Sequence, residues 1–146
     1  MKKKIFLLLG GILLLCGCGE KETKVTCKKT IEYEKQKVET SFIMYFGKDK
    51  ILKHSTTHIL ESEMSKETYE EKKKEYDELK NDEEYKTTKF TFHDKERTVE
   101  SDKNETYKVS NNEKNKYLAS NYIKEYEDMS YKCTIEGSTR KELGLK

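Results

Sequence analysis

Apolar and polar residues alternate along the first part of the chain, which is the pattern of strands with one buried face. From residue 25 to residue 34, apolar side chains occupy every second position except Lys29. The alternation recurs over residues 38–46, and residues 51–60 contain a Ser-Thr-Thr stretch that favours extended structure. The pattern therefore predicts three consecutive strands, with Gly47-Lys48-Asp49 as the turn between the second and the third.

Two later stretches have the apolar spacing of helices. Residues 65–81 begin with Ser65, a suitable N-cap, and carry a narrow apolar stripe. Ser110 and Glu113 have the spacing of a capping box, and a wider apolar face follows them. That face consists of Leu118, Ala119, Tyr122, Ile123 and Tyr126.

Three further stretches predict strands, at residues 88–92, 97–109 and 129–135, and a short turn is expected at 139–142. The strand over 97–109 is expected to be broken near Lys103. Runs of consecutive strands favour hairpins and hence antiparallel pairing. The predicted fold class is α+β, a mainly antiparallel β-sheet with two helices packed on one face.

The N-terminus has the layout of a secretory signal. Three lysines precede an 11-residue apolar run, residues 5–15, which is shorter than the about 20 residues that a membrane-spanning helix needs. Leu15 and Gly17 precede Cys18 as in a bacterial lipobox, whereas Cys16 directly follows the larger Leu15. We therefore expect residues 1–17 to be a signal peptide that is removed.

The predicted mature chain begins at a lipidated Cys18. A lipobox cysteine normally receives at least two acyl chains, palmitate-like in size, and two chains anchor a protein stably. Residues 18–24 are then a short tether, and residues 25–146 have the length of a single small domain. The expected location is the cell membrane, with the domain held on its extracellular face by the lipid.

The composition of residues 18–146 limits the classes of function. This part has 27 basic and 28 acidic residues, and its near-neutral charge argues against nucleic-acid binding. Leu, Ile, Val and Phe make up only about 16% of it, close to disordered composition, but all ten tyrosines lie there as additional core material. The excess of 28 lysines over 2 arginines and the absence of proline suggest a Gram-positive cell envelope.

Cys27 and Cys133 remain after lipidation, and both fall on the apolar faces of their predicted strands. An even pair of cysteines in an exported domain with a thin core predicts a disulfide. Closing a loop of about 100 residues contributes roughly 4 to 5 kcal/mol in the chain-entropy model. Two cysteines are too few for a metal site, so we expect no metal and no cofactor.

The sequence has further features in common with a known group of proteins. A Cys-Gly at the cleavage position is followed by "KVTCKKT", by hairpins and a charged Tyr-rich helix, and by a late "YKC". In these features residues 18–136 resemble the YehR-like family of small bacterial lipoproteins, whose function is not established. The resemblance implies a small α+β domain and supplies no catalytic residues.

Few residues suggest catalysis. His54 and His58 would share a helix face as metal ligands, but on a strand they lie about 13 Å apart at about 3.3 Å per residue, too far to share an ion. Ser138 and Lys141 have S-x-x-K spacing without the companion motifs of penicillin-interacting enzymes.

We therefore expect no enzyme, but a non-catalytic binding or accessory module for an unidentified envelope protein or surface ligand. The alternatives are a small envelope enzyme and a protein that captures a metal or a small ligand.

Overall fold

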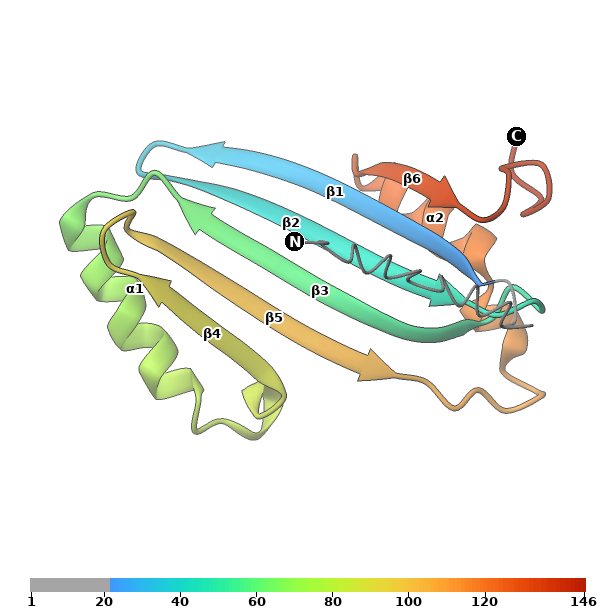
Figure 1. Cartoon of the computed structure of the whole chain (residues 1–146), viewed down its shortest axis with the longest axis horizontal. Helices are drawn as coiled ribbons and strands as arrows, with labels where there is room; N and C mark the ends of the chain where they lie inside the picture. The colour runs from blue at the N-terminus through green and yellow to red at the C-terminus, as the bar shows by residue number, and fades with distance from the viewer. Residues whose placement is uncertain (1–21) are drawn as a thin grey trace, which may run out of the picture.

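The computed structural model describes residues 22–146, which form one antiparallel sheet and two α-helices (Figure 1). The elements in chain order are β1 (Thr23–Tyr33), β2 (Gln36–Phe46), β3 (Leu52–Ser62), α1 (Lys66–Leu79), η1 (Glu83–Tyr85), β4 (Thr88–His93), β5 (Thr98–Thr106), η2 (Lys114–Tyr117), α2 (Ala119–Asp128) and β6 (Lys132–Glu136). The predicted α+β class is confirmed.

The six strands lie in the order β4-β5-β3-β2-β1-β6. Hairpins join β1 to β2, β2 to β3 and β4 to β5, and every strand pair is antiparallel. The chain leaves the sheet through α2 and returns to place β6 on the free edge of β1. The first and last strands of the sequence are therefore neighbours.

Strand register puts the apolar side chains of all strands on one face of the sheet. Cys27 lies opposite Phe42 of β2, and Val99 of β5 lies opposite both Glu61 of β3 and Phe92 of β4. Following the pairs from strand to strand shows that these residues share a face. Both helices pack on this face, as predicted, α1 over the β4–β5 side and α2 over the β1–β6 side (Figure 1).

The core consists of two clusters, one beneath each helix. The cluster beneath α2 contains Val25, Cys27, Met44, Phe46, Leu52, Ala119, Ile123, Leu143 and Leu145. Aromatic side chains extend it, for example Phe42, whose ring stacks on that of Tyr126 with centroids 4.5 Å apart. The cluster beneath α1 contains Met64, Tyr69 and Val99. The tyrosines thus supply core volume that the scarce aliphatic residues do not, and burial raises the pKa of Tyr126 to about 12.

A buried carboxylate joins α1 to the sheet. The Glu61 side chain is only 5% exposed, accepts a hydrogen bond from the Tyr76 hydroxyl and lies 3.5 Å from the Lys72 ammonium. Burial, followed by the contact with Glu61, raises the pKa of Tyr76, so this hydroxyl keeps its proton at neutral pH. Because a buried carboxylate is costly without partners, these two contacts help to fix α1 on the sheet, together with the packing of Tyr69.

Several predicted boundaries differ from those of the structure. The strand predicted over 97–109 is unbroken at Lys103 and ends at Thr106, because the whole stretch pairs with β3. The hydroxyl of Ser110 does donate to Glu113 at 2.6 Å, but this pair begins a turn and η2, and α2 starts only at Ala119. The last strand begins at Lys132 instead of residue 129, since α2 continues to Asp128. Ser65 caps α1 as predicted, its side chain accepting from the Thr68 amide.

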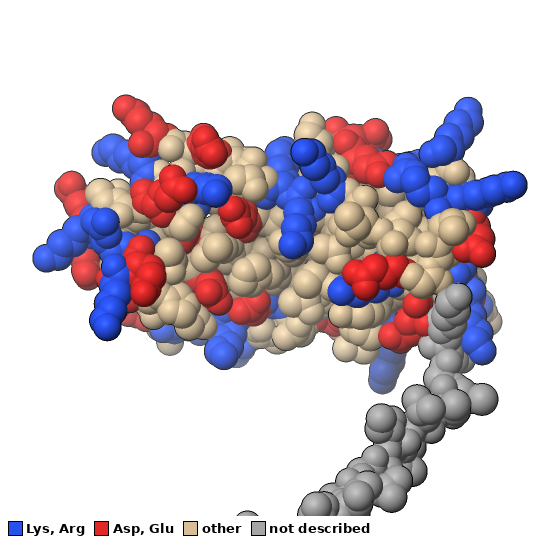
Figure 2. Space-filling model, turned by 45° about the horizontal axis from the view of Figure 1, so that its top comes forward, with Lys and Arg blue, Asp and Glu red and all other residues tan. Residues whose placement is uncertain are grey.

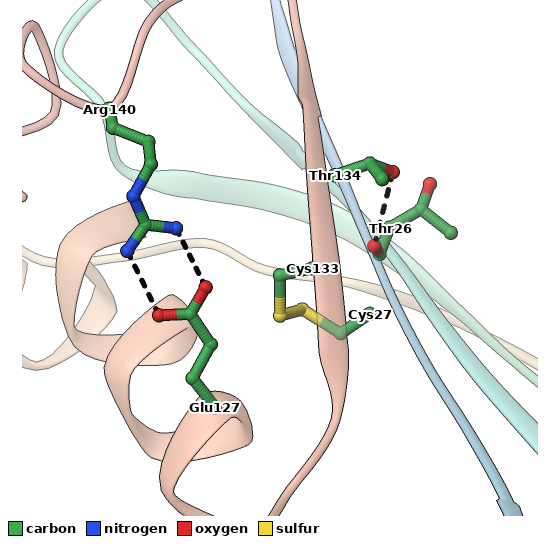
Figure 3. The surroundings of a disulfide bond; sticks show 6 residues. All are labelled: Thr26, Cys27, Glu127, Cys133, Thr134 and Arg140. Atoms are coloured by element: carbon green, nitrogen blue, oxygen red, sulfur yellow. Dashed lines mark hydrogen bonds and ion pairs between the residues drawn. A yellow bond between two sulfur atoms is a disulfide. The ribbon is translucent and has the colours of Figure 1, made fainter.

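The predicted disulfide between Cys27 and Cys133 is present and links β1 to the edge strand β6 (Figure 3). The two cysteines are directly paired in the sheet register, with Cα atoms 4.0 Å apart. The chain beyond β6 is held as well: the Arg140 guanidinium donates two hydrogen bonds to Glu127 on α2, at 2.7 and 3.0 Å. These contacts close the β1 edge of the sheet over the core beneath α2.

Replacing both cysteines, by Cys27→Ala with Cys133→Ala, is expected to lower the free energy of unfolding by about 2 to 4 kcal/mol, because the crosslink spans a long loop. Urea denaturation of wild type and variant measures the difference. The matched control is the reductant: it should destabilise the wild type and leave the variant unchanged. Equal midpoints for the oxidised wild type and the variant would contradict a stabilising role.

Candidate binding site on the open sheet face

The face of the sheet opposite the helices is covered by no element of residues 22–146 (Figure 1). Its side chains are those that alternate with the core residues, so they are polar for the most part. We call this surface the open face. A hollow of about 940 Å³ lies on its β6–β1–β2 side. Its lining includes four lysines, at positions 24, 28, 29 and 132, and a single carboxylate, that of Glu136. His58 of β3 also lines it.

Three cross-strand pairs between β1 and β6 form the floor of this hollow. Lys24 lies opposite Glu136, and their charged groups are 3.2 Å apart. Thr26 lies opposite Thr134, whose hydroxyl donates to the Thr26 carbonyl oxygen at 3.4 Å (Figure 3). Lys28 lies opposite Lys132. The first pair is of opposite charge and the third is of like charge, although both occupy the same two strands.

The like-charged pair Lys28–Lys132 is the unusual feature of the open face. Like charges directly opposite one another in an antiparallel pair are destabilising. Both side chains are exposed, and among residues 22–146 no carboxylate lies within 4.0 Å of either ammonium. Lys29, in contrast, donates to the Met129 carbonyl oxygen at 2.8 Å. Lys28 and Lys132 therefore leave positive charge available to an anion that enters the hollow.

The histidines lie on strands, as the alternation indicates. The ring of His54 stacks on that of Tyr45, with centroids 4.3 Å apart. His58 lies opposite Asp102 of β5, and its Nδ1 is 2.8 Å from an Asp102 carboxylate oxygen. His93 is the last residue of β4, with its Nε2 3.2 Å from a Glu100 carboxylate oxygen. The His93 Nε2 is buried and makes no hydrogen bond to the described residues, in spite of its nearness to Glu100. Among residues 22–146 the histidines belong to no cluster that could hold a metal ion.

The structure describes two of the three cysteines that the sequence predicts as site residues. Cys27 and Cys133 are joined, whereas Cys18 lies outside the described residues. Within residues 22–146 there is no cluster of three or more His, Cys, Asp or Glu side chains that could hold a metal ion. In the same part of the chain, no helix is both long enough and apolar enough to cross a bilayer. Ser138 is in the C-terminal turn, where its hydroxyl donates to Glu142 at 3.0 Å.

The alternation of apolar and polar residues does not by itself identify the Lys28–Lys132 pair. Both lysines stand at the polar positions of alternating stretches, one residue from Cys27 and Cys133 respectively. Once a disulfide between the cysteines is assumed, their neighbours on β1 and β6 become paired on the opposite face. The two cysteines were therefore the signal from which the lysine pair could have been found.

Comparison with known proteins gives no relative from which to assign a role to this face. No protein-family model, no curated protein and no solved structure matches the chain.

Reversing one charge of the lysine pair should make the protein more stable. Lys132→Glu turns a repulsive cross-strand pair into an attractive one, and we expect a gain of about 0.2 to 1 kcal/mol in the free energy of unfolding. Urea denaturation at low salt measures it, and added salt should reduce the gain by screening. Lys132→Gln, which removes the repulsion without adding an attraction, should fall between the two. A less stable Lys132→Glu protein would show that the pair is not under repulsion.

Proposed function

We propose that this chain is a lipoprotein of the extracellular face of the cell membrane, anchored through Cys18, whose domain binds an anionic envelope partner without catalysing a reaction. The observation that carries the proposal is the pair of unneutralised lysines, Lys28 and Lys132, in a hollow of the open face. Complementary charge gives such a surface both specificity and a faster encounter with its partner. The strand pairing also fixes the spacing of the two lysine backbones before binding.

The proposed anchor leaves little freedom to the domain. β1 begins at Thr23, five residues after Cys18, so the tether spans about 17 Å at about 3.3 to 3.6 Å per residue. The domain would then remain next to the membrane. Membership of the YehR-like lipoproteins stays a prediction. It is supported by the lipobox and the two cysteine motifs of the sequence, and an α+β domain of this size agrees with it.

One observation favours a small envelope enzyme as the second candidate. His58 lines the hollow and contacts Asp102, an arrangement in which a carboxylate can orient a general base. Two facts place it second. His58 and Asp102 are also a cross-strand pair, which by itself stabilises a sheet. In addition, no hydrogen bond joins His58 to a hydroxyl nucleophile among the described residues. Metal or small-ligand capture has no such supporting contact.

The anchor has its own test. Cys18→Ala should release the protein from the membrane fraction of cells that process lipoproteins, because the acylated side chain is lost. Fractionation followed by immunoblotting measures the distribution, and Cys27→Ala, which removes the disulfide and leaves Cys18 in place, is the matched cysteine control. Retention of the Cys18→Ala protein to the same extent as the wild type would contradict lipid anchoring at this residue.

The binding face is tested by crosslinking on intact cells, followed by capture of the full lipoprotein and mass spectrometry. Lys28→Glu with Lys132→Glu should reduce recovery of the partner by about tenfold, equivalent to about 1.4 kcal/mol of binding free energy, because the site becomes repulsive to an anion.

The control for that experiment is Lys74→Glu with Lys124→Glu, which makes the same charge change at exposed positions of α1 and α2. These helices lie on the opposite side of the sheet, so partner recovery should be unchanged. Equal recovery from both double variants would rule out the open face as the binding site. Loss of substrate turnover by His58→Gln, in a protein that remains folded, would instead favour the enzyme.

A further inference from the structure

Three segments at one end of the domain carry an excess of positive charge. Two of them connect elements of the fold and the third is the C-terminal segment. They are residues 47–53, residues 107–118 and the C-terminal segment 137–146, and we call them together the basic end. Their basic residues are Lys48, Lys50, Lys53, Lys108, Lys114, Lys116, Arg140, Lys141 and Lys146, against the acidic residues Asp49, Glu113 and Glu142. The basic end thus has a formal charge of +6 from these side chains.

The opposite end of the sheet differs. Its connections, residues 33–36, 62–67 and 93–98, contain four basic and five acidic residues. In Figure 2 several long blue side chains project at the right-hand end, with red groups among them, and red and blue are also mixed at the left-hand end, so the difference in charge comes from the counts of residues. The domain is therefore polarised along its length, although its net charge is close to zero.

The basic end is also where the chain enters the fold. The Lys50 ammonium donates to the Thr23 hydroxyl at 3.3 Å, and the Lys50 carbonyl oxygen accepts from the Ala119 amide at 3.0 Å. On the other side, a Cβ added to Gly137 would lie 2.6 Å from the Glu22 carbonyl oxygen, so the C-terminal segment also passes close to the first described residue. All three segments surround the start of β1 (Figure 1).

Much of this charge is not neutralised within the domain. Six of the lysines are exposed and have no Asp or Glu carboxylate within 4.0 Å among residues 22–146: Lys48, Lys108, Lys114, Lys116, Lys141 and Lys146. Lys53 differs, with its ammonium 3.6 Å from Asp49, and Arg140 is bound to Glu127. These six lysines are therefore free to contact an external anionic surface.

We infer that the basic end docks on the anionic phospholipid headgroups around the anchor. This inference rests on the proposed lipidation of Cys18, because the short tether is what brings the basic end to the membrane. Each lysine near an anionic bilayer surface favours association, and the attraction acts over about a Debye length, roughly 10 Å at 0.1 M salt. A tether of about 17 Å at full extension keeps these lysines near that range.

Docking in this way would orient the binding site. β1 to β3 have 11 residues each, so at about 3.3 Å per residue they extend about 35 Å from the basic end. With that end on the membrane, the long strands stand upright and the open face is turned sideways. Lys28 and Lys132 would then be held clear of the headgroups and accessible to a partner in the envelope.

Lysine footprinting of the full lipoprotein, acylated in cells and reconstituted into vesicles, tests the inference. A membrane-impermeant amine reagent is applied in phosphatidylcholine vesicles and in vesicles of equal parts phosphatidylcholine and phosphatidylglycerol. We expect Lys48, Lys108 and Lys141 to react severalfold more slowly in the anionic vesicles only. At about 1 M salt, where the Debye length falls to about 3 Å, the protection should disappear.

The internal control is the opposite end of the same molecule. Lys35, Lys66 and Lys95 are also exposed and should react at the same rate in both vesicles. Equal labelling of both ends in all vesicles, or equal protection of the basic end with and without anionic lipid, would overturn the inference. Failure of the protein to float with either vesicle would instead contradict the anchor, so the two failures are distinguishable.

A charge-reversal series gives an independent measurement. Lys108→Glu, Lys114→Glu and Lys116→Glu together should abolish protection of Lys48 and Lys141, which remain available as reporters. The same reversal at Lys35, Lys66 and Lys95 should leave the protection intact. If the first triple variant were misfolded by circular dichroism, the salt dependence of the wild type would still decide, and persistent protection in a folded variant would contradict docking through the basic end.

Discussion

The structure depends on one constraint: the chain has too few aliphatic side chains to bury both faces of a six-stranded sheet. Leu, Ile, Val and Phe make up only about 16% of residues 18–146. An antiparallel sheet can leave one face in water, and this one concentrates its apolar residues on the face beneath α1 and α2. Tyrosines fill much of the remaining volume. The open face that results is both the consequence of a thin core and the surface available for binding.

The disulfide links the small apolar core to the candidate binding site. Cys27 and Cys133 are paired on the helix-covered face, and because successive residues of a strand alternate between faces, Lys28 and Lys132 are paired on the open one. A slip of one residue would exchange the two faces, so the crosslink that closes the edge of the core also maintains the lysine pair. The repulsion between the lysines is tolerated in a strand pair that the disulfide already holds together.

The net charge of the domain does not show how charge is distributed over its surface. Residues 18–146 have nearly equal numbers of acids and bases, yet folding gathers an excess of bases at one end of the long axis of the sheet. The connections around the start of β1 are basic, while those at the other end are mixed. This separation arises because every second connection of an antiparallel meander returns to the same end, which gathers residues far apart in sequence, such as Lys48, Lys114 and Lys141.

The sequence by itself determined the fold class, the strands at residues 23–62, α1 with its Ser65 cap, and the cysteine pair, since these follow from alternation, local capping and the scarcity of core residues. The predicted start of α2, end of β5 and start of β6 were wrong, because local signals such as Ser110 and Glu113 do not reveal long-range contacts such as the pairing of Leu118 with Ile51 just before α2. Only the tertiary structure decided the strand order and the basic end, and it established the direct Cys27–Cys133 pairing from which the Lys28–Lys132 pair follows. Each depends on contacts between residues distant in sequence, and hydrophobic periodicity carries no information about which strands become neighbours.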